Sequence, residues 1–182
     1  MAFNSIQSNL PCFCGSKSDF ASCCKPYIDK TRLVVTGEQL MRSRFSAYAC
    51  GNAQYIYDTY AASNQAEQSV EDIDDWGQSC VWVALTIHSK EATLTTTEQF
   101  VEFSAFYITN NVLCELREKS RFILEANIGL HENSKQWRYI DGDIIAHNEL
   151  ANIKRNSLCP CNNYPTTWII NKGKKFKHCC GK

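Results

Sequence analysis

The sequence predicts an α+β protein in which helices pack on a curved antiparallel sheet, with a small cysteine-rich segment at each end. Three observations support this prediction: helical periodicity in the first half, alternating apolar residues in the second half, and cysteines clustered near both termini. Helices followed by a meander of long strands are typical of α+β domains. A strongly curved sheet of this kind is cone-shaped and encloses a cavity, which is a common ligand site.

The length and composition fit one domain with small appendages. The chain has 182 residues, of which 44% are hydrophobic and 21% are charged, so the composition is that of a globular protein. No apolar run approaches the roughly 20 residues that a membrane helix needs. The segment Met1–Leu10 lacks the basic start and apolar core of a signal peptide. We therefore expect a cytoplasmic protein without membrane insertion.

The first feature along the chain is a cluster of four cysteines. Cys12 and Cys14 are followed, after eight further residues, by Cys23 and Cys24. Four thiolates are what a closed tetrahedral Zn²⁺ site requires, and so short a segment needs such a staple to fold. A disulfide framework would require an oxidising compartment, and an iron–sulfur cluster is also a four-thiolate site. Zinc is the favoured interpretation, and both alternatives stay open at this point.

Helices are predicted for the next segment. Thr36–Gln39 matches a capping box, and apolar residues then recur at helical spacing as far as Gly51. Arg44 falls outside this apolar stripe. We expect a second helix over residues 53–60 and a third from Ser69, whose first turn contains acidic residues that the helix dipole favours.

Strands are predicted for the second half, where the pattern changes to period two. These segments are rich in Thr, Val, Phe, Tyr and Trp, which favour strands. The expected strands span residues 81–87, 92–109, 112–127 and 135–141. Asn110–Asn111 and Asp141–Gly142 are turn signals.

The chain ends in a second copy of the cysteine pattern with a longer loop. Cys159 and Cys161 are followed, after seventeen further residues, by Cys179 and Cys180. The ligand number again suits zinc, so we expect up to two structural zinc ions as cofactors. The candidate metal ligands are Cys12, Cys14, Cys23, Cys24, Cys159, Cys161, Cys179 and Cys180.

Charge is distributed unevenly, although the formal net charge is zero. Residues 31–150 carry 9 Lys and Arg against 17 Asp and Glu, whereas residues 151–182 carry seven basic residues and no acidic one. A basic tail could contact RNA through its phosphates. Lysines next to a four-thiolate zinc site also offset its net negative charge, and this second interpretation is preferred. RNA contact is therefore a minor hypothesis.

Both cysteine clusters resemble a known zinc knuckle. Cys12–Ser16 followed by Cys23–Cys24 resembles the SEC-C motif, found at the end of the preprotein translocase ATPase SecA. The tail, Cys159–Gly181, is similar but has an insertion at about residues 163–171 and Asn162 where glycine is usual. In that family the motif binds zinc and contacts protein partners, so the resemblance implies a zinc site and a protein partner.

The middle of the chain resembles the central domain of the YchJ-like family of bacterial proteins. The matching stretches are residues 38–49, 100–103, 116–122 and 137–142. This domain is similar to the nuclear-transport-factor-2-like (NTF2-like) fold, and the family implies no established activity. We expect an N-terminal knuckle over residues 1–30, a cone-shaped domain over 31–153 and a C-terminal knuckle over 154–182.

A pocket is expected inside the cone, but the sequence identifies no catalytic residue. If Glu102, Glu118 and Arg121 point into the cavity, the arginine could hold a carboxylate and one of the glutamates could act as a base. An ion pair that braces adjacent strands is the alternative that we favour. The candidate pocket residues are Trp82, Glu102, Glu118, Arg121 and Trp137.

These observations lead to three functional hypotheses. The first is a non-catalytic module whose knuckles dock a protein partner, with the translation or secretion machinery as candidates. The second is a small-molecule binding protein or enzyme that uses the cavity. The third is weak RNA contact through the basic tail.

Overall fold

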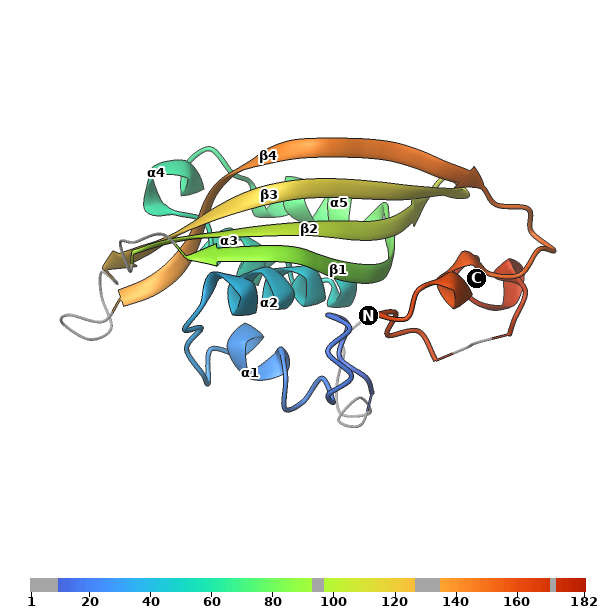
Figure 1. The fold of residues 1–182 in the computed structure, drawn as a ribbon, viewed down its shortest axis with the longest axis horizontal. Coiled ribbons are helices and arrows are strands. Elements are labelled where there is room, and N and C mark those ends of the chain that lie inside the picture. Colours follow the sequence, from blue (N-terminus) through green and yellow to red (C-terminus); the bar gives the residue numbers. More distant parts are fainter. Residues whose placement is uncertain (1–9, 93–96, 127–134, 171–172) are drawn as a thin grey trace.

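Two layers, a group of helices and a four-stranded sheet, make up the body of the molecule (Figure 1). The structure is a computed structural model and describes residues 10–92, 97–126, 135–170 and 173–182. The sheet is antiparallel throughout, with the strand order β1-β2-β3-β4. The predicted α+β class is confirmed. Among the described residues, no helix has the length and apolar character needed to cross a membrane.

The helices are α1 (Lys25–Ile28), α2 (Gly37–Cys50), α3 (Ala53–Asp58), α4 (Ala62–Gln65) and α5 (Val70–Gln78). The helices α2 and α5 begin where local signals predict, whereas α1 and α4 were not expected from the sequence and α3 ends at Asp58 instead of residue 60. The side chain of Thr36 caps α2 by accepting a hydrogen bond from the Gln39 amide, and Gly51 ends the helix with a φ of 71°. Ser69 caps α5 in the same way as Thr36. These three positions confirm the predicted helix boundaries.

The strands form a meander, but three of them differ clearly from the predicted ranges. They are β1 (Val81–Ala92), β2 (Glu98–Thr109), β3 (Val112–Ala126) and β4 (Lys135–Asn152). Asn110 and Asn111, both with positive φ, form the predicted turn between β2 and β3. The expected strand over 92–109 is wrong at its start, because Ala92 ends β1 and β2 begins at Glu98.

The predicted turn at Asp141–Gly142 is also wrong, because β4 continues through it. Gly142 pairs with Ser120 of β3. A Cβ atom at residue 142 would collide with the carboxylate of Glu118, so the glycine makes room for that side chain. The turn-like dipeptide therefore reflects a close approach between strands.

One hydrophobic core lies between α2 and the sheet, and a second lies on the opposite face of the sheet. Neighbouring residues on a strand point to opposite faces, so Tyr107 joins the first core and Ile108 the second. The N-terminal knuckle packs into the first core and the C-terminal knuckle into the second. Figure 1 shows the C-terminal knuckle beyond one end of the strands and the N-terminal segment beside α2.

Candidate metal centres and cavity

The four sulfur atoms of the N-terminal knuckle lie within 4.8 Å of one another. Gly15 has a φ of 74°, and its amide donates to the Cys12 carbonyl, so the chain turns tightly after Cys14. The Sγ atoms of Cys14 and Cys23 are 3.7 Å apart, and those of Cys23 and Cys24 are 3.9 Å apart. A tetrahedral site with Zn–S bonds of about 2.3 Å has sulfur–sulfur edges of about 3.8 Å. The spacing therefore suits a four-thiolate zinc ion.

The protonation pattern of these thiols also suits a cation. Hydrogen bonds among them lower the pKa of Cys14 and Cys23, the latter to about 7, and raise the pKa of Cys12 and Cys24. The four groups thus compete for negative charge. A divalent cation would remove this competition, since metal binding displaces thiol protons and holds every ligand as a thiolate.

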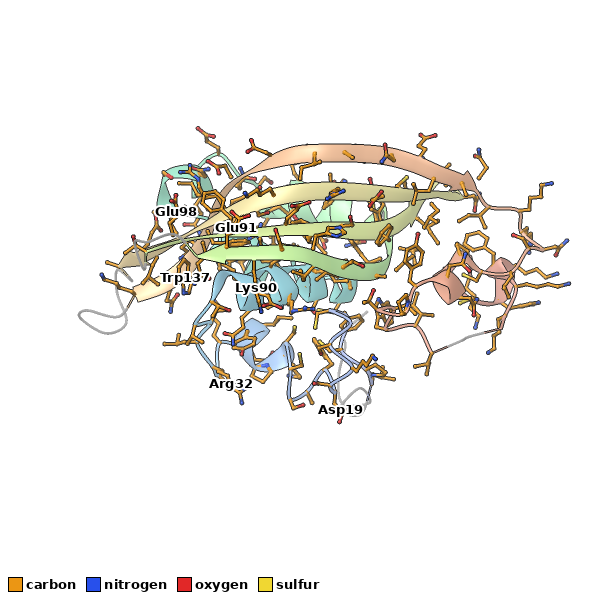
Figure 2. All side chains as sticks on the ribbon, in the orientation of Figure 1. Asp19, Arg32, Lys90, Glu91, Glu98 and Trp137 are labelled. Carbon is orange, nitrogen blue, oxygen red and sulfur yellow. The ribbon has the colours of Figure 1, made fainter. Side chains whose placement is uncertain are left out.

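The N-terminal knuckle is anchored to α2 by direct contacts. The Sγ atom of Cys12 lies 3.7 Å from the Ser46 hydroxyl. Arg42 donates from Nη1 to the Cys14 carbonyl at 3.1 Å and from Nε to Glu38 at 2.9 Å. Lys90 of β1, labelled in Figure 2, donates to the second oxygen of Glu38. The knuckle, the helix and the sheet are linked through this chain of polar contacts.

The C-terminal knuckle repeats the cluster in a different setting. Its four sulfur atoms also lie within 4.8 Å of one another, with 3.5 Å between Cys161 and Cys179 and 3.8 Å between Cys179 and Cys180. Burial raises the pKa of Cys161 and Cys180. Burial acts in the same direction on Cys159, but hydrogen bonds from the backbone amides and the side chains of Cys161 and Cys180 together outweigh it and lower its pKa. The eleven cysteines, all within the described residues, form no disulfide, and these sulfur separations are too long for one.

The insertion in the C-terminal knuckle connects the two knuckles. The Trp168 ring lies edge-on to Phe13, with 4.5 Å between ring centroids. Trp168 donates from Nε1 to the Trp82 carbonyl at 3.2 Å, and Thr167 donates to the Val83 carbonyl at 2.8 Å. Because β1 is an edge strand of the sheet, these bonds cover backbone groups that would otherwise be unpaired.

A cavity of about 140 Å³ lies between the helices and the concave face of the sheet. Of the candidate pocket residues, Trp82 and Glu118 line it. Arg44 of α2 also lines it and is only 6% exposed, although its position outside the apolar stripe of the helix gave no indication of burial. The guanidinium lies between the rings of Tyr60 and Tyr139, which shield it from water. No sequence signal identified this arrangement.

The other three candidate pocket residues lie elsewhere. Glu102 pairs with Arg117 of the neighbouring strand at 2.5 Å. Trp137 is 4% exposed, belongs to the first core, and is not among the residues that line the cavity. Figure 2 shows Trp137 toward the end of the sheet that is remote from the C-terminal knuckle.

Arg121 makes an ion pair that braces neighbouring strands. Its Nε and Nη2 atoms donate to the two oxygens of Asp141 at 2.9 and 2.5 Å, and Nη1 donates to Glu98 at 3.3 Å. The guanidinium lowers the pKa of Asp141. This is the bidentate geometry of a strong arginine–carboxylate pair, here between β3 and β4.

Comparison with known proteins assigns the middle of the chain. Residues 36–142 match the family model described as "YchJ, middle NTF2-like domain". A UPF0225 protein of Photorhabdus laumondii is 37% identical over 172 residues, which cover 93% of this chain and 98% of that protein. A UPF0225 protein of Vibrio cholerae is 34% identical over 172 residues, which cover 94% of this chain and 100% of that protein. The chain belongs to the YchJ-like UPF0225 family.

Solved structures share the fold of this YchJ-like protein. A SEC-C motif containing protein of Psychrobacter arcticus has a TM-score of 0.67 at 24% identity and covers 97% of this chain and 98% of its own. A SEC-C motif containing protein of Rhodopseudomonas palustris has a TM-score of 0.65 at 23% identity. The match covers 75% of this chain and 100% of the Rhodopseudomonas chain. The family resemblance is thus confirmed: an NTF2-like domain is flanked by two four-cysteine clusters.

Proposed function

We propose that this protein is a cytoplasmic, zinc-stabilised docking module whose C-terminal knuckle binds an acidic segment of a partner protein. The observation that carries the proposal is the surface of that knuckle. Arg155 and Lys175 are exposed, and Leu158, which forms a β-bridge with Lys175, is 56% exposed. Residues 151–182 contain no acidic residue. An apolar side chain among cations suits a partner segment with acidic and apolar residues.

The charge distribution of the whole molecule also favours an acidic partner. A four-thiolate zinc site carries a net charge of −2, which the seven basic residues of the tail exceed. The rest of the molecule is acidic over residues 31–150. A positive end on an acidic body orients the protein as it approaches a negatively charged partner, which raises the association rate.

The N-terminal knuckle has a structural role in this proposal. Cys12, Cys14 and Cys24 are at most 1% exposed and belong to the first core. The insertion covers Phe13 on the side facing the C-terminal knuckle. Zinc here would stabilise the body of the protein, and zinc in the C-terminal knuckle would shape the docking surface.

A defined probe tests the docking surface. Fluorescence anisotropy would compare a peptide of Glu and Leu residues with a single-stranded RNA of equal length and charge, both titrated with the zinc-loaded protein. We expect the peptide to bind, and the double variant Arg155→Glu/Lys175→Glu to weaken binding at least about tenfold. The exposed Lys17 of the N-terminal knuckle supplies a matched control, since Lys17→Glu should change little.

Two results would contradict the proposal. One is the absence of saturable peptide binding at low salt. The other is RNA binding that exceeds peptide binding and falls steeply as salt rises, which would identify a phosphate-binding surface instead.

A further inference from the structure

The cavity beneath the sheet contains two charged groups that do not pair with each other. Arg44 of α2 and Glu118 of β3 both line it. Neither takes part in any of the ion pairs formed among the described residues. Charges withdrawn from water are unfavourable unless an opposite charge or hydrogen bonds compensate them. This cavity therefore suits a ligand that compensates both groups.

The guanidinium of Arg44 is held in a fixed orientation. It lies between the rings of Tyr60 and Tyr139, 4.6 and 4.7 Å from their centroids. Its Nη1 atom donates to the Ile56 carbonyl at 2.8 Å and to the Thr59 hydroxyl at 2.7 Å. Within the described part of the chain, Nε and Nη2 make no hydrogen bond. A fixed guanidinium with a free edge binds a carboxylate through two parallel hydrogen bonds.

Glu118 has one occupied oxygen and one that is available. Its Oε1 atom accepts hydrogen bonds from the Ser120 hydroxyl at 2.5 Å and from the Tyr139 hydroxyl at 3.2 Å. Burial raises the pKa of Tyr139, so its hydroxyl remains a donor. Oε2 accepts no hydrogen bond from the described residues. It is placed to accept one from a hydroxyl or amine of a ligand.

Aromatic rings form much of the remaining wall, beside the aliphatic side chains of Met41 and Leu116. The rings of Tyr48 and Trp82 are stacked at 5.1 Å, and Trp76 meets them edge-on at 5.0 and 5.1 Å. Trp76 is 40% exposed, so this wall reaches the surface. An apolar cavity of roughly 150 Å³ accommodates one benzene molecule. A volume of about 140 Å³ therefore suits a ligand with a single ring.

We propose that this cavity binds a small planar monocarboxylate that also carries one hydrogen-bond donor, with the chemistry of a hydroxybenzoate. The carboxylate pairs with the free edge of Arg44, the ring packs against the aromatic wall, and the donor contacts Oε2 of Glu118. The negative charge of Glu118 disfavours a second anionic group, so dicarboxylates are rejected.

Three probes test the class of ligand. The probes are 4-hydroxybenzoate, benzoate and 4-hydroxybenzyl alcohol, titrated into the full-length protein and followed by calorimetry and tryptophan fluorescence. We expect saturable binding of 4-hydroxybenzoate, weaker binding of benzoate, and binding of the neutral alcohol that is at least about tenfold weaker. Absence of saturable binding by all three, or equal affinity for acid and alcohol, would overturn the proposal.

Variants locate the binding. Arg44→Met should raise the dissociation constant of 4-hydroxybenzoate at least about tenfold. Arg44→Lys should have an intermediate effect, because lysine keeps the positive charge but lacks the paired N–H donors of the guanidinium. Arg117→Met, on a side chain that pairs with Glu102 outside the cavity, is the matched control and should leave binding unchanged. Unchanged affinity in Arg44→Met would overturn the assignment.

A second variant keeps the proposal falsifiable if the Arg44 variants do not fold, since Arg44 also supports α3. Glu118→Gln preserves size and removes the negative charge. We expect this variant to bind the dicarboxylate terephthalate, which the natural protein should reject. Equal affinity of the two proteins for terephthalate would contradict the role given to Glu118.

Discussion

The two knuckles share one ligand pattern but differ in what surrounds them. The cysteines of the N-terminal knuckle pack in the main core and are tied to α2 through Ser46, which contacts the Cys12 sulfur, and Arg42, which donates to the Cys14 carbonyl. The C-terminal knuckle has its own small core on the opposite face of the sheet. The comparison shows that one four-cysteine pattern can pack into the main core in one place and against a separate small core in another.

The largest expected difference comes from removing zinc ligands. Cys12→Ser/Cys14→Ser should lower the free energy of unfolding by about 5 kcal/mol or more, because the main core would lose the zinc ion that stabilises it. Cys159→Ser/Cys161→Ser should remove one zinc but leave the helix–sheet body folded, at a loss of about 2 kcal/mol. Native mass spectrometry would count the zinc, and circular dichroism would follow melting. Equal melting temperatures for the two variants would contradict the comparison.

The contact that joins the knuckles should have the next largest effect. Trp168→Ala removes the packing on Phe13 and the hydrogen bond to the Trp82 carbonyl, and should lower stability by about 3 kcal/mol. Trp168→Phe keeps a ring and loses only the hydrogen bond, at about 1 kcal/mol. Urea unfolding of the zinc-loaded proteins measures both. Losses of equal size would show that the hydrogen bond dominates and that the ring contact contributes little.

Matched glycines in the two knuckles provide a finer test. Gly15 and Gly173 have φ values of 74° and 79°. A Cβ at Gly15 would collide with the backbone of Thr166 in the insertion, whereas at Gly173 it meets no described atom within 4 Å. Gly15→Ala should cost about 3 kcal/mol and Gly173→Ala about 1 kcal/mol, measured by thermal unfolding. The additional stability loss of Gly15→Ala over Gly173→Ala should be smaller in the Trp168→Ala background if that variant lets the insertion move away from Gly15.

The smallest expected effect is that of an acid-sensitive anchor at the N-terminal knuckle. Hydrogen bonds from Lys90 and Arg42 lower the pKa of Glu38. A carboxylate with a lowered folded-state pKa adds stability above its unfolded pKa of about 4.3, and this stability is lost as the pH falls through the folded value.

Glu38→Gln tests this anchor. The variant should be less stable than the natural chain by about 0.5 kcal/mol at pH 6, and the difference should disappear toward pH 3. Protonation of the zinc ligands affects both proteins and cancels in the difference, which denaturant unfolding at each pH would measure. A difference that grows on acidification would contradict this role.

Local signals made most of the secondary structure and the candidate ligands predictable. Thr36, Gly51 and Ser69 set helix boundaries through contacts within a few residues, so sequence spacing is sufficient to find them. Alternation along β2 and β3 likewise depends only on the strand geometry. Asp141–Gly142 gave a wrong turn prediction because local chemistry was the only guide. The dipeptide is typical of turns, but the residue that explains Gly142 is Glu118 on another strand.

By itself, the sequence determined the eight candidate zinc ligands and the α+β class, because spacing and periodicity express short-range geometry. Its matching stretches carried the family resemblance. Only the tertiary structure decided that the insertion joins the knuckles through Trp168 and Phe13, and that Arg44 is buried beside a cavity. These contacts join residues far apart in the chain. Their partners are chosen by packing in three dimensions, and no local pattern records that choice.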